Sequence, residues 1–107
     1  MSIIDNFETM LANGQDSSLL RFGLGQAYLG EENYDLAITH LTKALEFDNS
    51  YSAAWKLLGK AYVAIEDTAQ AIHAYEQGIG IAEEKGDIQA AKEMRVFLKR
   101  LTKNTAP

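Results

Sequence analysis

The chain has 107 residues, of which 47% are hydrophobic and 23% are charged, a composition that is ordinary for a single folded domain. It contains no cysteine, which excludes disulfides, thiol chemistry and cysteine-ligated metal sites. No apolar run is long enough for a membrane span, and the first eight residues lack the basic region and apolar core of a secretory signal. We therefore expect a single cytoplasmic domain over residues 1–107, with a net charge of -5.

The first predicted element is a helix over residues 3–13. Ser2 is suited to cap its start, Asn13 with Gly14 is a typical stop signal, and Asp16 is placed to cap the next helix. The apolar residues of this helix match those of a later helix, thirty-four residues on, in the same order. These residues are Ile3, Ile4, Phe7, Met10 and Leu11, which match Ala37, Ile38, Leu41, Ala44 and Leu45. The segment is therefore predicted to be half of a repeated unit.

Residues 18–51 and 52–85 carry one pattern twice, at a fixed spacing of thirty-four residues. The matched residues are Leu24, Gly25, Ala27, Tyr28, Ala37 and Ile38 in the first copy and Leu58, Gly59, Ala61, Tyr62, Ala71 and Ile72 in the second. Their spacing predicts two helices in each copy, joined by a short turn. Because glycine is unfavourable inside a helix, Gly25 and Gly59 indicate that the two helices approach each other closely.

The second copy resembles the tetratricopeptide repeat, whose pattern is W-x2-L-G-x2-Y, then A-x3-F, then P. The residues that carry the resemblance are Trp55, Leu58, Gly59, Tyr62, Ala71 and Tyr75, with Gly78 at a position where the family usually has alanine. The first copy departs from the pattern, because Arg21 replaces the tryptophan and Asn49 stands where proline is common. The resemblance covers residues 18–85 and implies an all-α array of helical hairpins, an α-solenoid with about six helices.

The last predicted helix covers residues 87–102 and resembles the capping helix that closes such arrays. Its apolar stripe consists of Ile88, Ala91, Met94, Phe97, Leu98 and Leu101. Residues 102–107 have no apolar pattern, and we expect them to form a frayed tail.

This last helix is also basic, since residues 92–103 hold five basic side chains and one acidic one. One interpretation is contact with an acidic protein or a nucleic-acid backbone. The other is that cations near a helix C-terminus complement the helix dipole and solvate its outer face. The acidic balance of the whole chain favours the second interpretation and argues against a nucleic-acid partner.

The family resemblance implies a binding groove on the concave side, lined by the first helix of each hairpin. The groove residues carried over by register are Leu19, Phe22, Gln26 and Leu29 in the first copy and Lys56, Lys60 and Val63 in the second. The two lysines can hold an acidic peptide group, while Phe22 and Leu29 can receive an apolar side chain. The alternatives are that the lysines are only solvated and that the two apolar residues are covered by the N-terminal helix or a second copy. Family members that clamp a C-terminal carboxylate use lysine and asparagine where this chain has Phe22 and Gln26, so that clamp is not expected.

Nothing in the sequence indicates a catalytic, cofactor-binding or metal site. His40 and His73 have no histidine or carboxylate at the spacing of a metal site and are expected at the surface or its boundary. The glycines of 23–25 and 78–80 lack the rest of a dinucleotide motif and are interpreted as helix-packing residues. We expect a non-enzymatic adaptor that binds a peptide or helix of a partner protein. The alternative is a self-assembling structural element that pairs through Ile3, Ile4 and Phe7.

Overall fold

The computed structural model describes residues 2–105 of the chain, which form six helices and contain no strand. The helices are α1 (Ile3–Ala12), α2 (Ser18–Gly30), α3 (Tyr34–Phe47), α4 (Ser52–Ala64), α5 (Thr68–Lys85) and α6 (Ile88–Thr105). The all-α prediction and the number of helices are confirmed. Over residues 2–105, no helix combines the length and apolar character that a membrane span requires.

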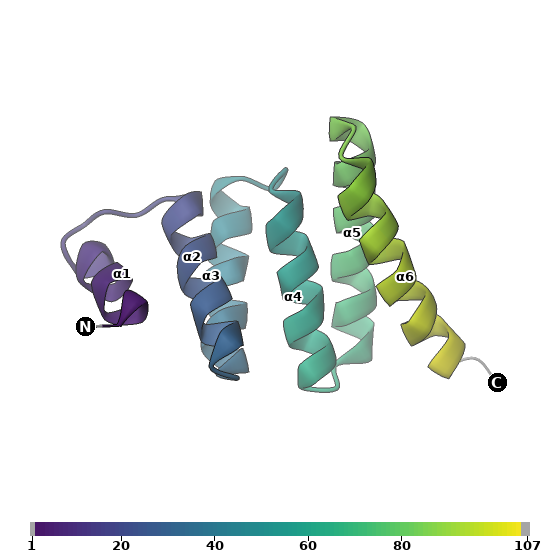
Figure 1. Cartoon of the computed structure of the whole chain (residues 1–107), viewed down its shortest axis with the longest axis horizontal. Helices are drawn as coiled ribbons and strands as arrows, with labels where there is room; N and C mark the ends of the chain where they lie inside the picture. Colours follow the sequence, from purple (N-terminus) through teal and green to yellow (C-terminus); the bar gives the residue numbers. More distant parts are fainter. Residues whose placement is uncertain (1, 106–107) are drawn as a thin grey trace.

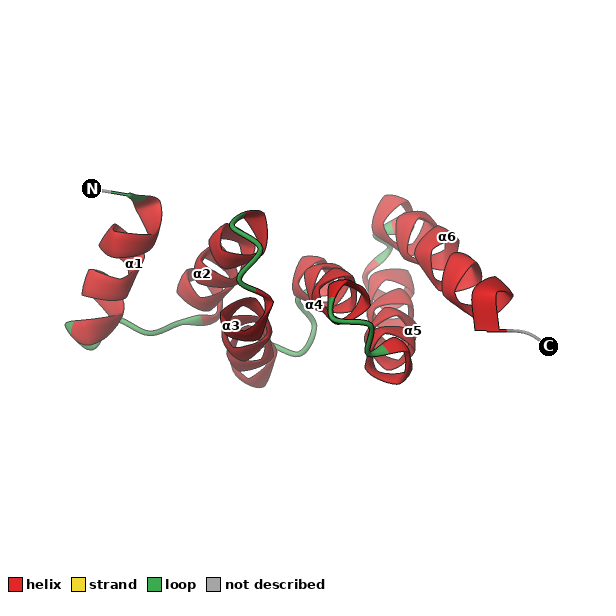
Figure 2. Ribbon diagram, turned by 90° about the horizontal axis from the view of Figure 1, so that it is seen from below, coloured by secondary structure: helices red, strands yellow, loops and turns green. Residues whose placement is uncertain are grey.

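The helices stack side by side into an elongated array of 48 × 29 × 19 Å, with the two chain ends at opposite ends of the long axis (Figure 1). Helices α2 and α3 form one antiparallel hairpin, and α4 and α5 form the next. Figure 2 shows two rows, with α2, α4 and α6 in one and α3 and α5 in the other. The first row dips at α4, so its outer face is concave.

Close approach within each hairpin depends on the repeated glycine. A Cβ atom placed on Gly25 would lie 2.5 Å from Cγ of Leu41, and one placed on Gly59 would overlap the ring of Tyr75. Since real Cβ atoms do not come this close to carbon, a larger residue would force the helices apart. The two glycines therefore perform the packing role that the sequence predicts.

Gly78, which stands where the family usually has alanine, is explained by the last helix. A Cβ atom at this position would lie 2.5 Å from Sδ of Met94 and 2.8 Å from Cβ of Trp55. Met94 is fully buried, and it packs together with Tyr75 and Ala91. The missing methyl group of Gly78 thus makes room for α6 to pack against α5.

The turns inside the two hairpins are equivalent in conformation and in chemistry. Glu32 and Glu66, thirty-four residues apart, both adopt left-handed backbone conformations, with φ of 61° and 62°. Asn33 and Asp67 follow them, and each side chain accepts a hydrogen bond from a backbone N–H at the start of the next helix. The sequence repeat is therefore a structural repeat down to its turns.

Two expectations about the helix ends are wrong. Ser17, not Asp16, caps α2, because its hydroxyl accepts a hydrogen bond from the N–H of Leu20, while Asp16 pairs with Arg21. Helix α6 continues to Thr105, past the expected end at residue 102. The rest of the predicted tail, residues 106–107, lies outside the described residues.

Two expectations about individual side chains also need correction. His40 is buried, with 5% of its surface exposed, and does not lie at the surface or its boundary as expected. The reason is that its ring stacks on Tyr28, at a centroid distance of 5.5 Å and an interplanar angle of 6°. Gly80 is exposed, and a Cβ atom placed on it would have no neighbour within 4 Å, so it is not a packing glycine, unlike Gly23 and Gly25.

Candidate functional site

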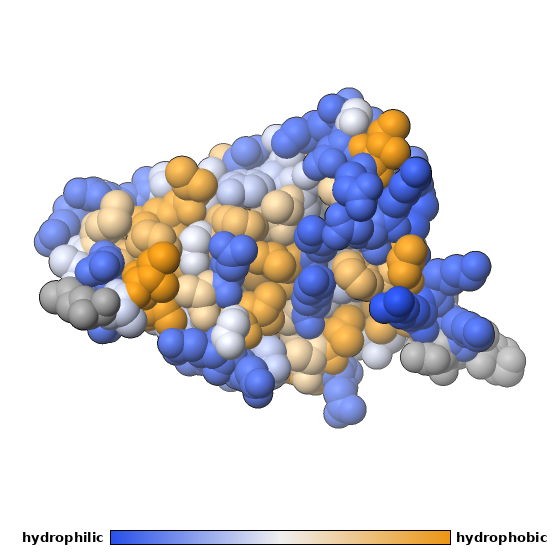
Figure 3. All heavy atoms as spheres, viewed as in Figure 1, coloured by the Kyte–Doolittle hydropathy of each residue, from blue (hydrophilic) through white to orange (hydrophobic). Residues whose placement is uncertain are grey.

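The concave face is built from the first helix of each hairpin, α2 and α4, together with α6, all of which lie in front in Figure 1. Its character changes along the array. Figure 3 shows the same face, with hydrophobic residues gathered over α1 and α2 and hydrophilic residues dominating over α6. Two separate hollows lie along it, and we call them the N-terminal hollow and the C-terminal hollow.

The N-terminal hollow has a volume of about 400 Å³ and is bounded by α1, α2 and the residue that precedes α4. Its walls are mainly apolar: Phe7, Met10, Leu19, Leu20, Phe22 and Tyr51, with Ser17, Gly23 and Gln26 completing them. The rings of Phe22 and Tyr51 are stacked, with centroids 4.7 Å apart, and so form one firm wall. Leu19 stands on the rim with 71% of its surface exposed.

Helix α1 forms the outer wall of this hollow, and two contacts position it. The Phe7 ring lies on Gly23, where an added Cβ would be 2.8 Å from a ring carbon. The Tyr28 hydroxyl donates a hydrogen bond to Glu8 over 2.5 Å. This hydrogen bond, together with burial and nearby negative charge, raises the pKa of Tyr28 to about 12, so the hydroxyl remains a donor at all physiological pH values.

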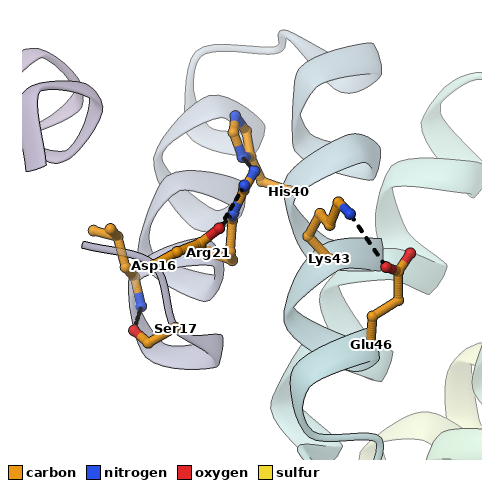
Figure 4. A network of polar contacts seen from close by, with 7 residues as sticks. Asp16, Ser17, Arg21, His40, Lys43 and Glu46 are labelled. Atoms are coloured by element: carbon orange, nitrogen blue, oxygen red, sulfur yellow. Dashed lines mark hydrogen bonds and ion pairs between the residues drawn. The ribbon is translucent and has the colours of Figure 1, made fainter. Parts of the chain in front are cut away.

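A polar network joins the linker before α2 to helices α2 and α3 and is drawn in Figure 4. Arg21 donates two hydrogen bonds of 2.8 Å to the Asp16 carboxylate, and its Nη1 lies 3.1 Å from Nδ1 of His40. The guanidinium has no acceptor atom, so Nδ1 accepts and His40 is neutral, with its proton on Nε2. Burial lowers the pKa of His40, in agreement with this neutral state. The hydrogen bond from Arg21 lowers the pKa of Asp16.

This network explains why arginine replaces tryptophan in the first copy. Trp55, at the equivalent position of the second copy, donates its indole N–H to the backbone oxygen of Asn49 and packs edge-on against His73. Arg21 instead joins the linker before α2, through Asp16, to α3, through His40. The substitution therefore holds the linker from α1 against the first hairpin.

The C-terminal hollow has a volume of about 290 Å³ and lies between α4 and α6. Apolar side chains line it, and two cations stand over them. Nζ of Lys60 is 5.2 Å and Cζ of Arg100 is 6.0 Å from the centre of the Phe97 ring. Because cation–π contacts leave much of each charge available, this hollow is suited to a group that is apolar and negatively charged.

Five of the seven predicted groove residues lie in these hollows. Leu19, Phe22 and Gln26 line the N-terminal hollow, and Lys60 and Val63 line the C-terminal hollow.

The remaining two predicted residues line neither hollow. Leu29 is half-buried and packs against the core of the first hairpin. Lys56 forms an ion pair with Glu93 over 3.3 Å. The predicted pair of lysines is thus divided, since Lys56 serves a contact within the chain and Lys60 faces the hollow.

Sequence reasoning missed the residues that come from outside the two first helices. They are Phe7, Met10 and Tyr51 in the N-terminal hollow and Tyr75, Phe97, Arg100 and Leu101 in the C-terminal hollow. A signal was present for Phe97 and Leu101, because the apolar spacing of the last helix resembles that of a first helix. Extending the groove to that helix would have found them.

A third hollow, of about 430 Å³, is bounded by α3, α4 and α5, and none of the predicted groove residues lines it. Its lining combines apolar and aromatic side chains, such as Leu45, Trp55 and Tyr62, with the polar Thr42, Gln70 and Gln77. Among the described residues, no three His, Asp or Glu side chains are grouped as metal ligands. His73 is exposed, and His40 is engaged by Arg21.

Two stacked helical hairpins with a helix at either end define a helical-repeat protein. Residues 28–94 match the family described as tetratricopeptide repeat, which is more than half of the chain. The chain belongs to this family, whose fold commonly mediates contacts between proteins.

Two similar proteins match nearly the whole length of the chain, and a third matches four fifths of it. It is 52% identical over 99 residues to the TPR repeat-containing protein PA0015 of Pseudomonas aeruginosa, a match that covers 92% of this chain and 94% of the relative. The solution structure of protein BPP2914 from Bordetella parapertussis has 46% identity and a TM-score of 0.87, covering 99% and 92% of the two chains. The crystal structure of a tetratricopeptide repeat domain protein from Salinibacter ruber has 28% identity and a TM-score of 0.74, with 80% and 97% covered.

Proposed function

We propose that this protein is a binding module that receives a peptide or helical segment of a partner protein on its concave face. The observation that carries the proposal is the N-terminal hollow, where apolar side chains line an open space of about 400 Å³. An open apolar hollow with a stacked aromatic wall is the kind of site in which one buried side chain supplies much of the binding energy.

The two hollows together suggest what the partner segment carries. The N-terminal hollow suits a large apolar side chain, because Phe22, Tyr51 and Met10 would surround it. The C-terminal hollow suits a carboxylate, because Lys60 and Arg100 stand at its edge. A segment that crosses from α2 over α4 to α6 would place an apolar side chain in the N-terminal hollow and an acidic group in the C-terminal hollow. The chain thus acts by binding, as an adaptor, and not by catalysis.

The experiment uses one substitution in the hollow and one matched control. Leu19→Glu places a charge on the rim of the N-terminal hollow, whereas Leu36→Glu places the same charge on α3, at a side chain that is 39% exposed. Both residues are exposed, so both variants should fold. Proteins captured from a cell extract by the unchanged chain are identified, and the binding segment of the strongest is titrated against each variant by NMR.

We expect Leu19→Glu to weaken binding at least tenfold and Leu36→Glu to leave it unchanged, since a buried charge without a partner is strongly unfavourable. Chemical-shift changes should concentrate on residues of α1, α2, α4 and α6. Equal affinities of the two variants, or shift changes confined to α3 and α5, would show that the partner binds elsewhere.

A further inference from the structure

The outer helices α1 and α6 carry exposed apolar side chains that a complete hairpin would bury. On α1, Ile3 and Met10 are 58% and 38% exposed. They occupy the register of Ala37 and Ala44, which in α3 are fully buried. In α3, these residues lie on the face that packs against α2, the first helix of the same hairpin, where Leu41 packs on Gly25. Helix α1 therefore exposes the face against which the first helix of a hairpin would pack.

Helix α6, at the other end of the array, takes the position of the first helix of a hairpin. It packs on α5 through Ala91 and Met94, in the same way that α4 packs on α3, so it lies in the row of first helices (Figure 2). Its outward side carries Ile88 and Val96, which are 63% and 49% exposed. The second helix of a hairpin, packed against α6, would cover these side chains.

The two ends also have opposite charges. Helix α1 holds two acidic side chains, Asp5 and Glu8, and no basic one, whereas residues 92–103 hold five basic side chains and one acidic one. On α6 the exposed cations include Lys92 and Lys99, and on α1 the exposed acidic residue is Asp5. The two ends are separated along the 48 Å axis. The acidic end of one copy should therefore attract the basic end of a second copy, whereas two like ends should repel each other.

We propose that copies of this chain associate head to tail, with α6 of one copy docking against α1 of the next and completing a hairpin between two chains. The contact joins two different surfaces, so it does not close on itself and can extend to further copies. Of the α1 side chains in this contact, Met10 also lines the N-terminal hollow, whereas Ile3 does not. The C-terminal hollow shares no residue with the exposed side chains of α6 named above.

The test uses the full chain and a variant at each end. Ile3→Lys adds a cation to α1 and lies outside the N-terminal hollow. The double variant Lys92→Glu/Lys99→Glu reverses the charge of the outer face of α6. Leu36→Lys and Lys43→Glu, both exposed and both on α3, are the matched controls. Masses are measured by sedimentation equilibrium over a range of protein and salt concentrations.

The unchanged chain should show a mass that rises with concentration and falls as salt is added, because salt screens the opposite charges. Each end variant should weaken association at least tenfold, which corresponds to about 1.4 kcal/mol. A mixture of the two end variants contains one unaltered junction, between α6 of the Ile3→Lys variant and α1 of the double variant, and should therefore associate more strongly than either variant alone.

Three results would overturn the proposal. One is an unchanged chain that stays monomeric at every concentration. Another is an α6 double variant that associates as well as the unchanged chain, which would indicate a symmetric contact between α1 helices. The third is a loss of association in the two α3 controls, which would place the contact on that helix.

Discussion

Helices α1 and α6 both cover an end of the array, yet they are held there by different interactions. No residue of α1 is fully buried, and the helix is positioned by the half-buried Phe7 and by the hydrogen bond between Tyr28 and Glu8. Helix α6, by contrast, buries Ala91 and Met94 completely. The N-terminal end is therefore held by half-buried apolar side chains, Ile4, Phe7 and Leu11, and by one side-chain hydrogen bond, whereas the C-terminal end is held by fully buried apolar packing.

The difference has a consequence for binding. Apolar packing creates a rigid surface, whereas a short helix held by a few contacts can adjust to what lies beside it. The N-terminal hollow, which is the main candidate site, has α1 as one of its walls. We infer that the array combines a rigid scaffold from α2 to α6 with an adaptable wall at its N-terminal end.

The largest effect is expected at the apolar end. Met94→Ala should lower the free energy of unfolding by about 3 kcal/mol, because it leaves a cavity against Gly78 in a fully packed site. Phe7→Ala should cost about 1 kcal/mol, because this side chain is only half-buried. Urea denaturation of both variants measures the difference. Equal losses would mean that the two ends are held equally well.

The next effect concerns the hydrogen bond that holds α1. Tyr28→Phe removes the donor to Glu8 and should lower stability by about 1.5 kcal/mol, as expected for a hydrogen bond to a charged acceptor. Tyr62→Phe, at the equivalent position of the second copy, is the matched control, and it should change stability by less than about 0.5 kcal/mol. Thermal unfolding compares the two. A similar loss in both variants would remove the special role of the contact with Glu8.

A smaller effect should appear when the pH is lowered. Burial is the main reason why the pKa of His40 is lowered in the folded state. Below about pH 6.5, the folded chain therefore binds fewer protons at this histidine than the unfolded chain does. Its contribution to stability is fully present above that pH and is lost as the pH falls towards the folded-state pKa. His40→Gln should flatten the dependence of stability on pH between pH 7 and pH 5, which urea denaturation across this range measures. An unchanged profile in His40→Gln would contradict the role given to this histidine.

The smallest effect is expected for the surface ion pair between α5 and α6. Arg95 pairs with Glu83, and both side chains are about half exposed. Arg95→Gln should change stability by less than about 0.5 kcal/mol, since such pairs are screened by water and salt. Chemical denaturation at low and high salt measures this. A loss comparable to that of Met94→Ala would mean that charge, not packing, holds α6.

The repeat made the fold predictable from particular residues. Gly25 and Gly59 predicted close helix packing, and the thirty-four-residue spacing predicted two hairpins, because both signals report contacts made within one unit. The site was less predictable. Leu19 and Lys60 were found by register, whereas Phe7 and Tyr51 reach the N-terminal hollow from other elements, which no local pattern indicates. The burial of His40 was missed for the same reason, since it depends on Tyr28 and Arg21 of another helix.

Native-state hydrogen exchange, followed residue by residue at a concentration where the chain is monomeric, tests the difference between the two ends most directly. We expect the amides of α1 to exchange through local openings of much lower free energy than global unfolding, and the amides of α6 around Met94 to exchange close to the global limit. Protection of α1 that equals or exceeds that of α6 would contradict the account of an adaptable wall beside the N-terminal hollow.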